Sequence, residues 1–339
     1  MHRVSTTKKT IALVALLTLI LAPAASARTV LKMASLVPDG SVWDKILKDM
    51  GAEWQEATDG EVSLRLYAGG IAGDEPDVVR KMRVGQLHGA MLTVAGLTLI
   101  DKSFEIFEIP MFFESYDELI HVLDVLRPEL EKRLDAKGYV LLNYGQGGWV
   151  HFFSKKPIQS VDDLRQQKLF VWAGNSPMVE LWKKNGFKPV PLAATDILTG
   201  LQTGMIEAFP STPLAALSFQ WFRQTPHMQG LGLAPLIGAT VMSKRAWRRL
   251  SPEVQKTLRG ITSETEERLN QEIPEQDQRA LEQMTKNGLT VSEVAPEVQD
   301  AWRKEAEIFI NFKREQMEAK DLLDLARKER DAFRASQGK

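Results

Sequence analysis

The sequence contains no cysteine, few histidines and, beyond its first residues, no long apolar run. The lack of cysteine excludes disulfides, a thiolate nucleophile and cysteine-ligated metal sites. The histidines are scattered and show no His-Glu-x-x-His spacing of a zinc enzyme; they are His2, His88, His121, His151 and His227. We therefore expect no metal and no cofactor, and stability must come from packing of the core.

A strong charge of either sign is also absent. The chain has 43 basic and 44 acidic residues, which gives a formal net charge of −1. Such a balance offers no electrostatic attraction for nucleic acid or for anionic lipid. Partners of those two kinds are therefore not expected.

The first 27 residues have the features of a targeting segment. A cationic start (Arg3, Lys8 and Lys9) precedes an apolar run over residues 11–21, and residues 25–27 read Ala-Ser-Ala. The run is too short to span a bilayer comfortably, and its order is typical of a secretory signal peptide. We expect cleavage after Ala27, export of the mature chain and no membrane insertion after cleavage.

Residues 161–217 organise the rest of the chain, because they contain two successive strand–helix units. The predicted elements are a strand over 168–172, a helix over 177–185, a strand over 187–190, a helix begun by Thr195 and a strand over 205–209. Parallel strands joined by helices place their loops at one edge of the sheet, where α/β proteins bind ligands. The sequence therefore predicts a ligand crevice at this edge.

The first third of the chain has the same alternation, with predicted strands over 30–36, 61–67 and 89–94 separated by helices. Residues 145–148, Gly-Gln-Gly-Gly, predict a flexible crossing between two regular regions. A strand over 231–242 should return to the first region. Ser251 and Pro252 begin a long helix, which Pro274 should kink or divide, and two amphipathic helices follow over 296–317 and 321–333.

Several short segments match one known family in order and spacing. They are residues 34–43 (ASLVPDGSVW), 67–74, 108–113 (EIPMFF), 156–158, 163–164, 168–177, 201–204, 206–208 and 250–252. With them the chain resembles the periplasmic solute-binding proteins of tripartite ATP-independent periplasmic (TRAP) transporters, of the dicarboxylate-receptor type. The resemblance implies an α/β fold of two lobes that close on a ligand like a clam shell, with a long helix contacting both lobes.

The lobe boundaries follow from this resemblance and from the predicted elements. We expect residues 28–148 and 241–275 in the first lobe, after the signal peptide of residues 1–27. Residues 149–240 and 276–339 are assigned to the second lobe, which would include the C-terminal helices.

The resemblance also implies a role for the strand over 168–172. Receptors of this family hold a substrate carboxylate with an arginine on that strand, and a guanidinium fixes a carboxylate through two parallel hydrogen bonds. This sequence has Phe170 there; a second arginine position falls on Trp149 or Val150, and an asparagine position falls on residues 211–212. Because an enclosed carboxylate without a cation costs several kcal/mol, we expect a neutral or largely apolar ligand.

The predicted ligand contacts are mainly van der Waals and stacking contacts, with Asn175 as a polar contact. These residues are Leu36, Trp43, Gly70, Ile71, Val94, Trp149, Phe170, Trp172, Asn175 and Phe209. For any one of the aromatic residues a place in the core is the alternative, because strands of such sheets are apolar on both faces.

Residues that could support other chemistry have simpler interpretations. Asp74, Glu75 and Asp77 lie at a predicted helix start, where acids are favoured by the helix dipole. No Gly-x-Ser-x-Gly sequence occurs, and we find no poised acid, base or nucleophile that would make the protein an enzyme.

We therefore expect a periplasmic receptor that captures one small organic molecule by lobe closure and delivers it to a TRAP-type membrane permease. Two alternatives stay open. The first is a receptor for an organic acid that uses a different cation. The second is a periplasmic enzyme or a sensor on the same two-lobed scaffold.

Overall fold

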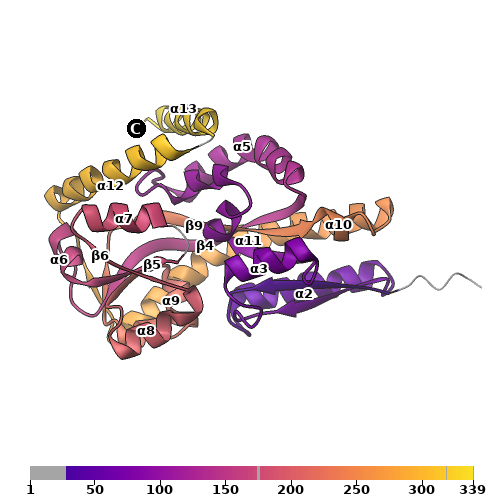
Figure 1. Ribbon diagram of the computed structural model, residues 1–339, viewed down its shortest axis with the longest axis horizontal. Coiled ribbons are helices and arrows are strands. Elements are labelled where there is room, and N and C mark those ends of the chain that lie inside the picture. The colour runs from indigo at the N-terminus through magenta and orange to yellow at the C-terminus, as the bar shows by residue number, and fades with distance from the viewer. Residues whose placement is uncertain (1–27, 174–175, 318, 339) are drawn as a thin grey trace, which may run out of the picture.

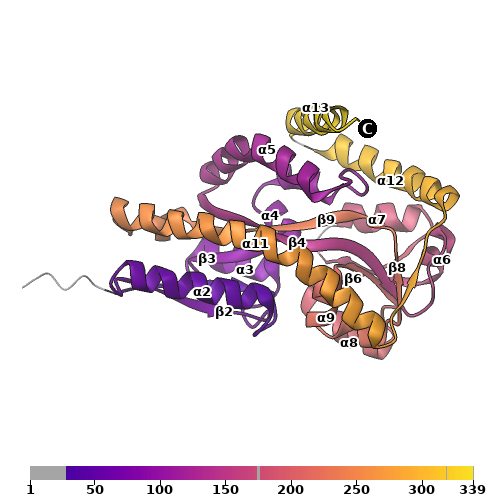
Figure 2. The same cartoon turned by 180° about the vertical axis from the view of Figure 1, so that it is seen from behind.

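The computed structural model describes residues 28–173, 176–317 and 319–338, which form two α/β lobes lying side by side (Figures 1 and 2). The predicted signal peptide, residues 1–27, and the predicted contact Asn175 lie outside the described residues. Within the described ranges, every helix is too short or too polar to cross a membrane.

The first lobe is built on three parallel strands that alternate with helices, as the sequence predicts. Ser41 begins the first of these helices, because its hydroxyl accepts a hydrogen bond from the Asp44 N–H at 3.3 Å. The elements are β1 (Thr29–Ser35), α2 (Val42–Ala57), β2 (Val62–Tyr67), α3 (Glu75–Val84), β3 (Gly89–Thr93), α4 (Val94–Thr98), the 3₁₀-helix η1 (Lys102–Glu108) and α5 (Tyr116–Ala136).

The second lobe contains the two predicted strand–helix units. Its elements are α6 (Val161–Gln166), β5 (Lys168–Trp172), α7 (Ser176–Lys184), β6 (Lys188–Leu192), η2 (Ala194–Asp196), α8 (Ile197–Thr203), β7 (Ala208–Ser211), α9 (Pro213–Ser218), η3 (Trp221–Gln224) and β8 (His227–Gln229). Strand β5 pairs in parallel with β6 and β7, as the predicted crossovers require. Thr195 lies within η2 and so does not cap the following helix, which differs from the prediction.

Two long antiparallel strands, β4 (Tyr139–Ser154) and β9 (Ala234–Ser243), connect the lobes. They unite the strands into one sheet of order β2-β1-β3-β9-β4-β7-β5-β6, and β10 (Thr290–Ser292) joins its margin through β8. A crossing between the lobes is predicted at residues 145–148. This segment is part of β4 rather than a flexible run, because its backbone pairs with β9, with an irregularity between Gln146 and Gly148.

The long helix α11 (Pro252–Lys286) follows the short α10 (Lys244–Trp247) and contacts elements of both lobes. It is continuous through Pro274, so the proline does not divide it, and Figure 2 shows the helix changing direction along its length. Its buried residues pack on α2 and β4 in its first half and on α9 in its second half. The prediction of one helix contacting both lobes is therefore confirmed.

The two C-terminal helices separate onto different lobes. Helix α12 (Pro296–Gln316) packs Trp302 and Phe309 into the second-lobe core, whereas α13 (Lys320–Ser336) lies on α5 of the first lobe (Figure 1). The sequence-based division assigned both helices to the second lobe. The position of α13 differs because its apolar face packs on α5, and Arg334 pairs with the buried carboxylate of Glu118 at 2.8 Å.

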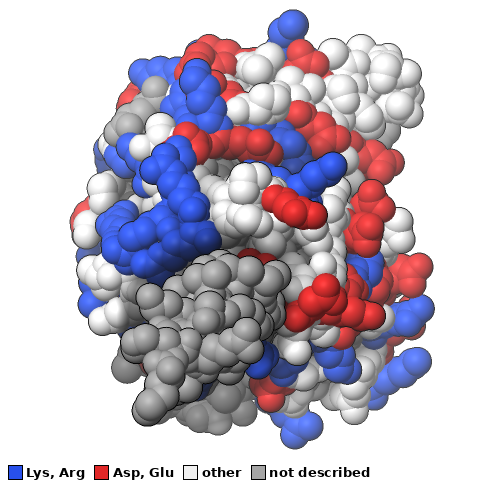
Figure 3. Space-filling model, turned by 90° about the vertical axis from the view of Figure 1, so that its right-hand side faces the viewer, with Lys and Arg blue, Asp and Glu red and all other residues white. Residues whose placement is uncertain are grey.

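The surface charges are mixed, as the net charge suggests. In the face shown in Figure 3, one large group of lysine and arginine side chains lies on the left, and acidic side chains alternate with further basic ones over the top and right. This face therefore presents both signs of charge, which does not favour a polyanionic partner.

Candidate functional site

A cavity of about 580 Å³ lies between the two lobes. The first lobe supplies the end of β3, α4 and η1 as one wall, and the second lobe supplies β5 and α7 as another. Helix α12 forms a further wall, which the sequence analysis did not assign to the site. Because the cavity meets the carboxyl ends of β3 and β5, its position agrees with the predicted crevice.

The walls of this cavity are largely apolar and aromatic. Phe170 on β5 is 1% exposed, and its ring makes an edge-on contact with Trp172, with centroids 5.2 Å apart. Across the cavity, Trp182 of α7 contacts Phe309 of α12 with ring centroids 4.3 Å apart. The indole N–H of Trp172 is buried and has no hydrogen-bond partner in the described part of the chain. A bound molecule would therefore meet flat apolar surfaces and one unpaired donor.

Glu75 is the main buried acid on the first-lobe wall. Its side chain, at the start of α3, is 2% exposed and accepts hydrogen bonds from the Thr93 N–H (2.6 Å) and the Thr93 hydroxyl (2.8 Å). Burial raises the pKa of Glu75 to about 7, although the hydrogen bonds from Thr93 act in the opposite direction. The sequence analysis interpreted it only as a helix-start acid, because its partner Thr93 is distant in the chain.

The cations around the cavity are lysines. Among the described residues that line it there is no arginine, whereas Lys102 and Lys313 are present. The Lys313 ammonium of α12 binds the Glu108 carboxylate of η1 at 2.5 Å. The side chain of Lys313 is 8% exposed, so this pair links α12 to the first lobe in a largely dry setting.

Three of the predicted contact residues, Val94, Phe170 and Trp172, line the cavity. The aromatic residues Trp43, Trp149 and Phe209 do not: Trp43 packs between the lobes, Trp149 contacts the Tyr116 ring, and Phe209 stacks on a core phenylalanine. For these three, the core alternative describes the observed packing.

The remaining predicted contacts lie at the lobe boundary outside the cavity lining. Gly70 lies beside Leu36 and Thr195, since a Cβ on this glycine would be 3.5 Å from Leu36 and 2.8 Å from Thr195. Ile71 is 74% exposed. The binding role of all these residues stays a prediction.

Other residues of the cavity wall were missed from the sequence. Trp302, Ala306, Phe309 and Lys313 lie on one face of α12, at intervals of three and four residues. That spacing indicated a buried helix face but not the surface it would cover. Only the docking of α12 against both η1 and α7 makes this face part of a cavity.

Two buried carboxylates beside the cavity accept hydrogen bonds from elements distant in the chain. Asp74 caps α3 by accepting from the Glu75 N–H (2.9 Å), and it also accepts from the Ala194 N–H of the second lobe (3.0 Å). Asp277 of α11 accepts from the Trp149 N–H (3.1 Å) and the Leu214 N–H (2.8 Å). Asp74 therefore joins the two described lobes, whereas Asp277 joins α11 to β4 and α9.

Comparison with known families and proteins gives one consistent result. Residues 33–315 match the family model described as "Bacterial extracellular solute-binding protein, family 7". The 2,3-diketo-L-gulonate-binding periplasmic protein YiaO of Escherichia coli (strain K12) is 25% identical over 242 residues, which cover 70% of this chain and 73% of that protein. The C4-dicarboxylate-binding periplasmic protein DctP of Rhodobacter capsulatus is 22% identical over 253 residues, covering 74% of this chain and 76% of that protein.

Solved structures share the fold. A TRAP periplasmic solute-binding protein from Sulfitobacter sp. NAS-14.1 with bound β-D-galacturonate superposes with a TM-score of 0.82 at 19% identity, covering 88% of this chain and 100% of that chain. A TRAP periplasmic solute-binding protein from Sulfurospirillum deleyianum DSM 6946 with bound succinate gives 0.81 at 20% identity, covering 88% and 98%. The two-lobed α/β architecture predicted from the sequence is thereby confirmed, and the molecules bound in both neighbours are carboxylates.

Proposed function

Because the chain belongs to family 7 of the bacterial extracellular solute-binding proteins, the receptors of TRAP transporters, we propose that it binds one small organic solute in the cavity between its lobes. The proposal is supported by the family match and by the 580 Å³ cavity at the edge of both parallel strand sets. Such a volume is in the range of small-molecule sites, which are mostly apolar with a few directed polar groups. The protein would act in the periplasm as a receptor rather than as an enzyme.

Delivery to a membrane permease follows from lobe closure in this proposal. The sheet strands β4 and β9 and the helix α11 run from one lobe to the other, so a change at these connections would change the relation of the lobes. A solute that contacts both walls binds the closed arrangement in preference to the open one. A TRAP-type permease could then distinguish loaded from empty receptor by shape.

We further propose that the solute is largely apolar. The observation that carries this proposal is the aromatic wall of the cavity, which contains no arginine among the described residues. Phe170, at the position where we expect the family's arginine, is 1% exposed and packs into the second-lobe core behind this wall. The surrounding rings of Trp172, Trp182 and Phe309 would contact an aromatic or aliphatic solute over a large area. The unpaired Trp172 N–H would donate a hydrogen bond to one acceptor on that solute.

An organic acid is the second candidate. The solved relatives contain bound acids, and the comparisons give no support to an apolar solute. In this case a carboxylate would approach Lys102 or Lys313 at the η1 and α12 side of the cavity, in place of the family's arginine. An ammonium is a point charge without the paired geometry of a guanidinium, so orientation would depend on the aromatic walls.

Replacement of Phe170 by arginine separates these candidates. For a largely apolar solute, the Phe170→Arg variant should bind at least about tenfold more weakly than the wild type, because a guanidinium would enter the cavity without an anion. The same variant should bind succinate or galacturonate more tightly than the wild type does. The solute is first identified by native mass spectrometry of purified protein, and affinities are then measured by calorimetry.

The matched control is Phe170→Leu, which keeps an apolar side chain and should bind the solute within a few-fold of the wild type. Circular dichroism verifies that both variants are folded. If the wild type binds succinate or galacturonate tightly and the mass spectrum contains an acid, the proposal of a largely apolar solute is wrong. The second candidate, an organic acid that approaches a lysine of the cavity, is then favoured. If no small molecule is retained or bound in a broad metabolite screen, the receptor function itself fails.

A further inference from the structure

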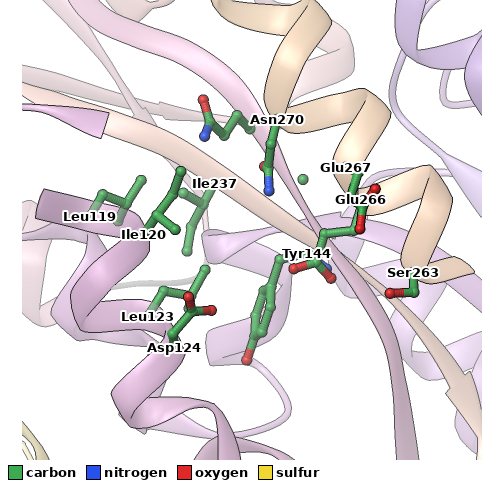
Figure 4. Close-up of a pocket in the computed structure, with 12 residues that line it drawn as sticks. Leu119, Ile120, Leu123, Asp124, Tyr144, Ile237, Ser263, Glu266, Glu267 and Asn270 are labelled. Atoms are coloured by element: carbon green, nitrogen blue, oxygen red, sulfur yellow. The ribbon is translucent and has the colours of Figure 1, made fainter. Parts of the chain in front are cut away.

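A second pocket, of about 210 Å³, lies on the first lobe and shares no lining residue with the solute cavity. Figure 4 shows it between α5 on one side and α11 on the other, with β4 behind them. An engineered cavity of about 150 Å³ is large enough to hold benzene. The pocket can therefore accommodate a planar molecule slightly larger than benzene.

The floor of this pocket carries an amide with no partner. Gln146 of β4 is 3% exposed, and neither its side-chain oxygen nor its side-chain nitrogen has a hydrogen-bond partner in the described ranges. Its backbone is used, since the Trp43 indole N–H donates to the Gln146 carbonyl oxygen at 3.1 Å. Buried amides are almost always satisfied by protein, water or ligand. One donor and one acceptor of this lining residue therefore stand unpaired beside the pocket, shielded from water.

The remaining walls combine apolar and polar groups. Leu119, Leu123 and Ile237 form an apolar side, and Figure 4 shows the Asn270 amide directed into the space between the helices. A planar ring would fit against the apolar side. The polar edge of such a molecule would then lie toward the two amides.

The charge at this pocket is negative. Two of its three carboxylates, Asp124 of α5 (62% exposed) and Glu267 of α11, are exposed to solvent. The third, Glu266, forms an ion pair with Arg127 and accepts a hydrogen bond from the Tyr144 N–H at 2.9 Å. Arg127 pairs with Glu266 and also lies 3.8 Å from the Asp124 carboxylate, whereas Glu267 has no ion pair among the described residues. An anionic molecule would be repelled, whereas a neutral or cationic molecule would not.

We propose that this pocket is a second binding site, for a small planar molecule that carries a primary carboxamide and is neutral or positively charged. The carboxamide pairs with Gln146 through two antiparallel N–H···O hydrogen bonds, which satisfies both unpartnered atoms at once. The ring lies against Leu123 and Ile237. The site is independent of the proposed solute receptor function, because it lies on one lobe and away from the solute cavity.

Three related pyridine derivatives of different charge test the proposal: 1-methylnicotinamide, nicotinamide and nicotinate. We expect the first two to bind, the cation at least as tightly as the neutral amide, and the acid at least about tenfold more weakly. Calorimetry with the full mature chain gives the affinities. A crystal structure with nicotinamide should contain the ring in the pocket and its amide on Gln146.

Two variants give the controls. Gln146→Leu should weaken nicotinamide binding about tenfold, since two hydrogen bonds are lost, while the fold is kept because an apolar side chain replaces an unpartnered amide. Glu267→Gln changes only an exposed side chain and should reduce the preference for 1-methylnicotinamide over nicotinamide about two- to fivefold. Phe170→Leu, in the other cavity, should leave all three affinities unchanged.

The proposal is overturned if the crystal structure at millimolar nicotinamide contains ordered water alone in the pocket. It also fails if nicotinate binds as well as nicotinamide, or if binding is insensitive to both pocket variants. Should Gln146→Leu not fold, the Glu267→Gln comparison and the crystal structure decide the matter. Failure here would leave the solute receptor function untouched, since that function is tested at Phe170.

Discussion

Replacing Asp277 by alanine is expected to lower the free energy of unfolding by about 4 kcal/mol. The carboxylate lies on α11, is 7% exposed, and accepts hydrogen bonds from the Trp149 N–H of β4 and the Leu214 N–H of α9. Alanine would leave both N–H groups buried without an acceptor, and each such group costs about 1–3 kcal/mol. The loss is concentrated where β4, α9 and α11 meet, so the packing of α11 on the second lobe should weaken with the stability.

Urea unfolding followed by circular dichroism measures this effect at pH 7. The matched control is Asp277→Asn, which keeps one acceptor oxygen and should lose only about half as much stability as the alanine variant. An alanine variant as stable as the wild type would show that water replaces the carboxylate at this junction. In that case Asp277 would not hold α11 to β4 and α9.

The stability of the solute-free protein is expected to fall as the pH rises from about 4 to about 7. Burial raises the pKa of Glu75 from 4.5 to about 7, and burial raises the pKa of Asp277 from 3.8 to about 6. In this interval the folded protein keeps protons that the unfolded chain has released, so raising the pH favours unfolding. One pKa unit corresponds to 1.36 kcal/mol, which makes the Glu75 contribution roughly 3 kcal/mol.

Chemical denaturation at a series of pH values tests this expectation, with Glu75→Gln as the matched variant. Glutamine has the same shape and no charge to bury, so the variant should lose about half of the pH dependence between pH 4 and 7. Exposed acids such as Asp39 and Asp77 do not mask the effect, because their pKa values are lowered and they titrate below this interval. Burial lowers the pKa values of His88 and His151, which raises stability with pH in the same interval, so the comparison with Glu75→Gln carries the test. Equal pH dependence in the wild type and in Glu75→Gln would contradict the assignment of Glu75.

Glu75 also connects this pH dependence to the solute site. The same carboxylate lines the cavity and is held by Thr93, at the end of β3. A solute that donates a hydrogen bond to Glu75 favours the ionised form and lowers its pKa. The pH dependence of solute binding in wild type and Glu75→Gln would then differ, which gives an independent measure of whether the solute reaches this wall.

The sequence by itself determined the local elements and their order. Apolar spacing and caps such as Ser41 and Ser251 are read within a few residues, because helix and strand formation depends on near neighbours. The strand–helix alternation then required parallel pairing of β5 with β6 and β7. The lack of an arginine on the strand that contains Phe170 was likewise visible without a structure, and its meaning for the ligand stays a prediction.

The tertiary structure alone decided which side chains meet. Trp172 and Phe209 come from neighbouring parts of the sequence and have the same apolar character, yet Trp172 lines the cavity and Phe209 stacks in the core. Glu75 accepts a hydrogen bond from Thr93, and α12 forms a wall of the cavity because it packs against η1 and α7. These outcomes depend on contacts between residues far apart in the chain, whose energies are set by packing and desolvation after folding, and no local pattern encodes them.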